Sequence, residues 1–143
     1  MQYIKQSIDK SKIWNFKRRV LNNNEFYASI DDGVIKWILQ NDNEYLYQES
    51  GTLVFQKNNN EENSDSINFF HTLIFVFNGN QYTVYRNNGS IFYKSNKKNK
   101  SSQMYNNTRY DVDVKYINNL ITTKVDITGK KKFSSSITNY YPI

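Results

Sequence analysis

The chain has 143 residues, which is long enough for one domain with a hydrophobic core and too short for two. It contains no cysteine, so disulfides are excluded, and it has no apolar run of the roughly eighteen residues that would span a membrane. The first residues, MQYIKQSIDKSK, lack the apolar segment of a secretory signal. We therefore expect a single cytoplasmic domain over residues 1–143.

The net charge of +6 raises the question of nucleic-acid binding. The chain has one alanine and one proline but many asparagines and lysines, a skew typical of an AT-rich genome. The lysines gather in two predicted turns, at residues 94–100 and 130–132, rather than on one element. The aromatic residues mostly share alternation with Val, Ile and Leu, which indicates core packing. We do not expect a nucleic-acid partner.

The first part of the chain predicts a short helical segment within residues 1–11, followed by strands. Trp14, Phe16, Arg18 and Val20 share one side of the first strand. Two further strands, 26–31 and 34–40, are expected to form a hairpin across Asp32-Gly33. The next strand begins at Tyr45 and alternates through residue 56.

The second part continues with short strands joined by Asn/Gly turns. Flexible loops are expected at 57–67 and 94–108, because both stretches are polar. Between and after these loops we expect strands at 69–77, 81–86, 90–93, 109–117, 120–128 and 133–141. This series predicts an all-β fold, an antiparallel up-and-down barrel of about eight to ten strands, because closing the meander removes its exposed edges.

Four short motifs, the last of them in two parts, occur in an order that resembles a known family. They are Trp14-x-x-x-Arg18-x-Val20, Tyr47-x-Glu49-x-Gly51-x-Leu53, Asn88-Gly89-Ser90-x-Phe92, Gly129-x-x-Lys132 and Thr138-x-Tyr140. Over about residues 12–141 the chain resembles the small lipocalin-like family of bacterial and eukaryotic proteins that is catalogued only as a domain of unknown function. The resemblance implies a calycin-type barrel with a central cavity and no known activity.

The chain departs from that family at several positions. Lys12 stands where members carry glycine, and Lys130 stands where they carry proline. Members also carry a His, Cys and Asp group where this chain has Gln103, Tyr105 and Thr108. If that group performs the family's chemistry, this chain has lost it.

Glu49 is a charged residue on an apolar face of its strand, which it shares with Tyr45, Tyr47 and Leu53. Arg18 is likewise surrounded by apolar residues on its own strand. If both faces point into one barrel, each charge would cost several kcal/mol when buried alone, so we expect an internal Arg18–Glu49 pair with tyrosine hydroxyls around it. The pair has two interpretations: a structural clamp between strands, which we favour, or a polar anchor for a ligand.

Other candidates for the barrel interior are Trp14 and Tyr110, together with Lys132 and Tyr140 of the last strand. Gly51 is expected to allow a bend or a close approach. His71, the only histidine, is interpreted as a hydrogen-bonded strand residue rather than a ligand. We expect no metal site, no cofactor and no catalytic constellation.

The sequence leaves two functions open. The first is non-catalytic binding of a small, mostly apolar molecule, with its polar end at Arg18, Glu49 and tyrosines. The alternative is a structural or assembly subunit with a self-filled barrel, whose basic loops contact a protein partner, because a barrel of this size can be filled or hollow. A monomer or weak oligomer is expected in either case.

Overall fold

The computed structural model describes residues 4–56, 65–96, 98–117 and 120–142, which form one helix and ten strands. The helix α1 spans Ile4–Lys10. The strands are β1 (Ile13–Asn22), β2 (Glu25–Asn41), β3 (Glu44–Phe55), β4 (Ser66–Asn78), β5 (Gln81–Tyr85), β6 (Ile91–Lys94), β7 (Lys100–Tyr105), β8 (Thr108–Ile117), β9 (Leu120–Thr128) and β10 (Phe133–Pro142). The predicted all-β fold with a short N-terminal helix is confirmed.

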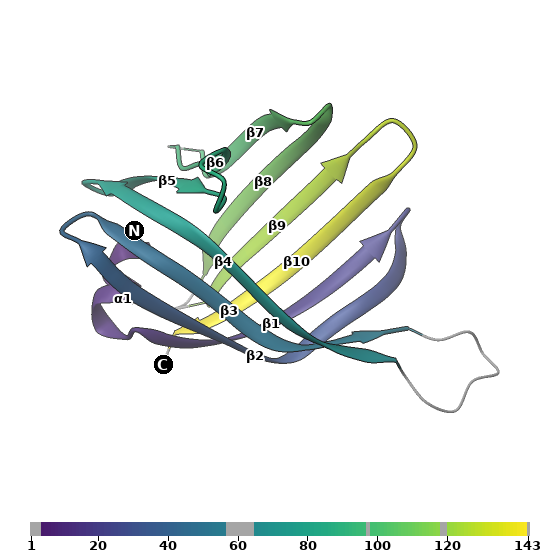
Figure 1. Ribbon diagram of the computed structural model, residues 1–143, viewed down its shortest axis with the longest axis horizontal. Helices are drawn as coiled ribbons and strands as arrows, with labels where there is room; N and C mark the ends of the chain where they lie inside the picture. Colours follow the sequence, from purple (N-terminus) through teal and green to yellow (C-terminus); the bar gives the residue numbers. More distant parts are fainter. Residues whose placement is uncertain (1–3, 57–64, 97, 118–119, 143) are drawn as a thin grey trace.

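The ten strands form a single antiparallel sheet in the order β6-β5-β4-β3-β2-β1-β10-β9-β8-β7. Every hydrogen-bonded neighbour is a sequence neighbour except the β1–β10 pair, which joins the two ends of the chain. The sheet curls into a nearly closed up-and-down barrel (Figure 1), an architecture consistent with a lipocalin-like fold. Its two remaining edges, β6 and β7, face each other along a seam.

No backbone ladder joins the described strands β6 and β7, which are the two ends of the sheet. Contacts made by side chains connect the two sides of this seam instead. Ser101 accepts a hydrogen bond from the backbone N–H of Lys94 at 3.2 Å. The guanidinium of Arg86, which follows β5, lies 4.1 Å from the centre of the Tyr105 ring of β7 and 4.7 Å from that of Tyr110 of β8. Cation–π contacts of this kind hold the two sides of the seam together.

The predicted Asn/Gly turns adopt the left-handed backbone that these residues tolerate best: Gly79 and Gly89 have φ values of 64° and 86°. Asn106 and Asn107, which lie in the stretch predicted to be a loop, do the same with values of 51° and 60°. These turns connect consecutive antiparallel strands, as the hairpin pattern requires.

The predicted hairpin at Asp32-Gly33 is wrong, because β2 runs through this dipeptide as one strand of 17 residues. The pairing of β2 with β3 shifts between Ile30 and Val34, so the dipeptide lies in a bulge. A side chain at Gly33 would place its Cβ 2.5 Å from the ring of Phe16. Glycine is required here for close packing against Phe16 and not for a turn.

The predicted loop at 94–108 is also wrong in part, because it contains β7. This strand pairs with β8 from Lys100–Asp113 to Tyr105–Thr108, and its residues alternate between exposed and half-buried. Its polar composition hides the alternation that marks the other strands. In the other predicted loop, 57–67, residues 57–64 lie outside the described residues, while Ser66 already begins β4.

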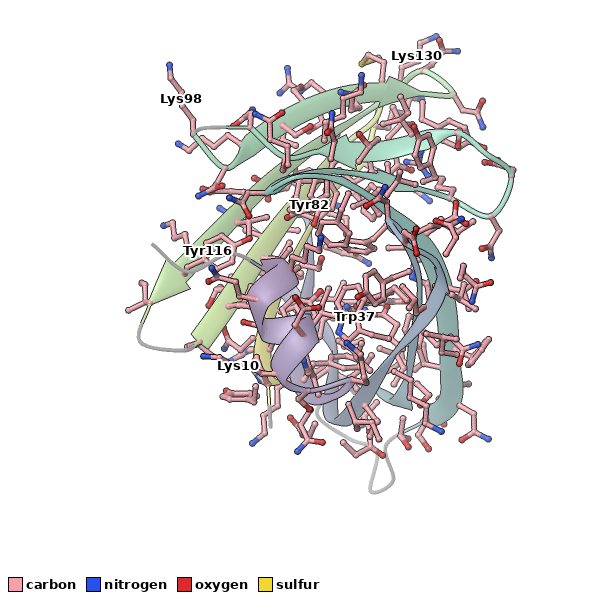
Figure 2. All side chains as sticks on the ribbon, turned by 90° about the vertical axis from the view of Figure 1, so that its left-hand side faces the viewer. Lys10, Trp37, Tyr82, Lys98, Tyr116 and Lys130 are labelled. Atoms are coloured by element: carbon pink, nitrogen blue, oxygen red, sulfur yellow. The ribbon has the colours of Figure 1, made fainter. Side chains whose placement is uncertain are left out.

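One end of the barrel is closed by α1 and by aromatic side chains. Ile4 and Ile8 of the helix are buried in the core. Figure 2 looks onto this end and shows α1 lying over it, with Trp37, Tyr82 and Tyr116 around the helix. Behind α1, the Trp14 and Trp37 rings meet edge to face with their centres 5.0 Å apart. This half of the barrel is filled by its own side chains.

Candidate functional site

A cluster of polar side chains lies inside the barrel, beyond the aromatic layer that α1 covers. Strand register brings them together: Arg18 of β1 lies opposite Thr138 of β10, and Glu49 of β3 lies opposite His71 of β4. Each of these residues has inward-facing neighbours two positions away, such as Phe16 and Tyr47, because side chains alternate along a strand. The four residues therefore project into the same interior.

Arg18 and Glu49 form the predicted internal ion pair, which confirms that prediction. The Nη1 and Nη2 groups of Arg18 each donate to one carboxylate oxygen of Glu49 at 2.7 Å, in a bidentate arrangement. Arg18 Nε donates to Thr138 Oγ1, also at 2.7 Å. The side chains of Arg18 and Glu49 are 14% and 2% exposed, so the pair is almost completely desolvated. It ties β1, β3 and β10 together across the barrel.

Two further groups hydrogen-bond the carboxylate of Glu49. The Tyr47 hydroxyl donates to Oε2, and Nδ1 of His71 lies 3.3 Å from Oε1. The Tyr140 hydroxyl lies 3.4 Å from that of Tyr47 and extends the network to β10. The predicted tyrosine hydroxyls around the ion pair are thus present, and His71 joins them.

The electrostatics keep this pair ionised. Burial alone would raise the pKa of Glu49, but the Arg18 guanidinium and the hydrogen bonds from Arg18, His71 and Tyr47 outweigh it and lower the pKa to about 2. Burial alone would lower the pKa of Arg18, yet the charge of Glu49 raises it. The pKa values of Tyr47 and Tyr140 are raised, mainly by burial, so both hydroxyls stay protonated.

A cavity of about 330 Å³ adjoins the polar cluster. One wall carries Arg18, Glu49, His71, Thr138 and Tyr140. The remaining lining is largely apolar and comes from β4, β6 and β9; it includes Phe69, Leu73, Phe75, Phe92, Val125 and Ile127. The His71 side chain is 43% exposed, which places it where the cavity meets solvent. The barrel is therefore filled in the half next to α1 and hollow in the other.

Three other predicted interior residues do not line the cavity. Trp14 is inside the barrel as predicted, but it is buried in the aromatic layer. Tyr110 packs against Arg86 and Phe92 at the seam. The interior position predicted for Lys132 is wrong: this residue is exposed in the turn before β10, where its carbonyl accepts from Gly129 N–H at 2.9 Å. The turn ends only after Lys132, so the alternation of β10 does not extend to it.

His71 is the cavity residue whose role the sequence understated. Its interpretation as a hydrogen-bonded strand residue is confirmed, but its partner, Glu49, and its place in the cavity wall were not predicted. The ten-residue connection between β3 and β4 does not fix the register of these strands as a two-residue turn would. The position of His71 beside Glu49 therefore becomes apparent only from the observed pairing of β3 with β4.

Among the described residues, no three His, Cys, Asp or Glu side chains are arranged to hold a metal ion. The described part of the chain likewise contains no helix that is long and apolar enough to cross a membrane.

Comparison with known proteins identifies one family. Residues 11–142 match the family described as "Family of unknown function (DUF6314)", so the match covers nearly the whole chain. No curated protein and no solved structure matches the chain.

Proposed function

Because the chain belongs to a family of unknown function, DUF6314, we propose its function from the site itself: the barrel binds a small, mostly apolar molecule in its hollow half without transforming it. The observation that carries this proposal is the cavity of about 330 Å³ with apolar walls and one polar wall. Ligand sites in proteins are typically concave and mostly apolar, with a few polar groups that fix orientation, and this volume lies at the small end of their range.

The apolar walls favour a ligand that buries hydrocarbon. Phe69, Phe92, Val125 and Ile127 are only partly buried, although they face the interior of the barrel. A ligand that covers them removes apolar surface from water, which contributes about 25 cal/mol for each Å². The half-exposed His71 marks the side from which such a ligand enters.

The polar cluster supports binding rather than catalysis. A general acid or base works best with a pKa near the working pH, whereas the pKa of Glu49 is about 2 and its oxygens are engaged by Arg18, Tyr47 and His71. His71 is oriented by a carboxylate, as a catalytic histidine would be. In the described residues, however, no serine or threonine hydroxyl hydrogen-bonds its ring to serve as a nucleophile.

The alternative of a self-filled barrel describes only the half of the barrel that α1 covers. There Trp14, Trp37 and Phe77 are buried together in the hydrophobic core. The hollow half favours the binding function.

The proposal is tested by filling the cavity. Val125→Trp places a large ring in the cavity, and the matched control, Lys124→Trp, places the same ring on the exposed side of β9 one residue away. Native mass spectrometry of gently purified protein is expected to detect a small molecule bound to the parent and to the control, and none bound to Val125→Trp. Circular dichroism checks that all three proteins remain folded.

Two results would overturn the proposal. One is a parent protein that carries no ligand and binds none from a panel of small apolar molecules. The other is binding that Val125→Trp leaves unchanged, because the ligand would then occupy another surface.

A further inference from the structure

The charges of the cavity wall are already matched to each other, and this decides which ligands the cavity accepts. Both oxygens of Glu49 are saturated: Oε1 accepts from Arg18 Nη1 and His71 Nδ1, and Oε2 accepts from Arg18 Nη2 and Tyr47. A carboxylate offers about four acceptor positions, so Glu49 has none left for a ligand.

Arg18 is occupied to nearly the same extent. Its two Nη groups face Glu49, and its Nε bonds Thr138. Its guanidinium carbon lies 5.0 Å from the centre of the Phe16 ring and 5.8 Å from that of Phe69, so these rings cover its faces. An incoming carboxylate would have to displace Glu49 to reach the bidentate edge. That exchange would leave the buried carboxylate of Glu49 without its counter-ion.

The hydrogen bonds also determine which protons remain available. Glu49 is ionised and can only accept, so the proton of an uncharged His71 sits on Nδ1 and its Nε2 is an acceptor. Thr138 Oγ1 already accepts from Arg18, which leaves its own hydroxyl proton free to donate. Because Tyr47 donates to Glu49, the bond between the two tyrosines uses the proton of Tyr140.

From this arrangement we propose that the cavity selects an electrically neutral apolar molecule whose polar end is a hydroxyl group. This inference rests on the proposed binding function and names the class of its ligand. A hydroxyl donates one proton and accepts another, which matches the acceptor at His71 Nε2 and the donor at Thr138. A carboxylate end would add a second negative charge beside Glu49 and, when His71 is uncharged, find no free cation among the described residues of the wall. An ammonium end would place a second positive charge beside Arg18, and Glu49 could not compensate it because its charge is already neutralised by Arg18.

The test compares three ligands with the same number of carbon atoms: octanol, octanoate and octylammonium. Isothermal titration calorimetry on the parent protein is expected to give octanol an affinity at least about tenfold above that of either ion, since an unpaired charge in a desolvated site costs more than a hydrogen bond contributes. Octanoate that binds as tightly as octanol would overturn the inference and leave the binding function intact. If none of the three binds, the proposed function itself fails at this site.

The single histidine allows the contact to be observed directly. Nitrogen NMR of the His71 ring, at a pH where the imidazole is uncharged, is expected to show the proton on Nδ1 and to show octanol shifting the Nε2 resonance. His71→Leu is expected to weaken octanol binding about tenfold, whereas Asn68→Ala, on the exposed face of the same strand, leaves it unchanged. A proton on Nε2, or an Nε2 resonance that octanol does not move, would refute the assigned contact.

Discussion

The ion pair between Arg18 and Glu49 makes the sharpest prediction about stability. Glu49→Gln keeps the size of the side chain and one acceptor oxygen but removes the negative charge. The Arg18 guanidinium, 14% exposed, then remains in the barrel without its counter-ion. Breaking a buried pair by removing one partner is strongly destabilising, because it leaves an uncompensated charge.

Two routes lead to a similar magnitude. The pKa of Glu49 falls from 4.5 to about 2 on folding, and at 1.36 kcal/mol for each pKa unit this corresponds to about 3 kcal/mol of stability from the ionised form. Removing one partner of a buried ion pair typically costs about 3–5 kcal/mol. We therefore expect Glu49→Gln to lower the free energy of unfolding by about 3–5 kcal/mol, a large part of what a domain of this size has.

The assay is equilibrium unfolding in urea, followed by the fluorescence of Trp14 and Trp37, which are buried in the same barrel. Glu25→Gln is the matched control, because it makes the same chemical change at an exposed position on β2 and is expected to change stability by less than about 0.5 kcal/mol. The double variant Arg18→Met/Glu49→Gln removes both charges and is expected to be more stable than Glu49→Gln alone.

Either of two results would refute this reasoning. A loss of less than about 1 kcal/mol in Glu49→Gln would mean that the pair is solvated and that the clamp interpretation is wrong. A double variant less stable than Glu49→Gln would mean that Arg18 stabilises the barrel through its contacts with Thr138 and Phe16 rather than through Glu49.

Three further predictions concern the pair's response to pH, the bulge in β2 and the seam. The folded pKa of Glu49 is below its unfolded value, so its contribution to the free energy of unfolding is complete above about pH 4.5 and is lost as the pH falls toward 2. Unfolding experiments at decreasing pH should show this loss of stability in the parent protein and not in Glu49→Gln. Gly33→Ala should lower the melting temperature by several degrees, because the new Cβ meets the Phe16 ring at 2.5 Å. Gly129→Ala, whose new Cβ has its nearest neighbours at 3.9 Å, should not lower it. Equal melting temperatures of the two variants would contradict the assigned packing. Arg86→Lys keeps the charge but loses the planar stacking on Tyr105 and Tyr110 at the seam. Amide hydrogen exchange should therefore accelerate in β6 and β7 and remain unchanged in β2. Equal exchange rates in the variant and the parent would show that other contacts close the seam.

The division of the barrel into two halves gives the polar cluster its position. The aromatic layer beneath α1 is filled by buried side chains, and the network of Arg18, Glu49, Tyr47 and Tyr140 begins where that layer ends. Beyond the network the interior becomes apolar again but is no longer filled. The ion pair therefore clamps the strands and forms part of the polar wall of the cavity, but its own hydrogen bonds leave it no position for direct contact with a ligand.

Local alternation was enough to predict most of the strands and the inward direction of Arg18 and Glu49. Side chains alternate along a strand, so a charged residue among apolar ones of the same parity must share their side of the sheet. A buried charge requires a partner, so Arg18 and Glu49 were expected to pair. Parity also placed Lys132 in the interior, and there it was wrong, because Lys132 precedes β10 and is exposed. The same reasoning failed where composition conceals the pattern, as in the polar strand β7, and where Asp32-Gly33 resembles a turn but forms a bulge.

Register, unlike alternation, is decided by the tertiary structure. The partnership of Glu49 with His71 depends on how β3 and β4 align across a long connection, and sequence does not determine that alignment. Whether the barrel is hollow depends on how side chains from many strands fill a common volume, a property of packing that no single strand carries. The sequence by itself therefore determined that Arg18 and Glu49 point inward and pair. Only the folded barrel decided that His71 joins them and that a cavity lies beside them.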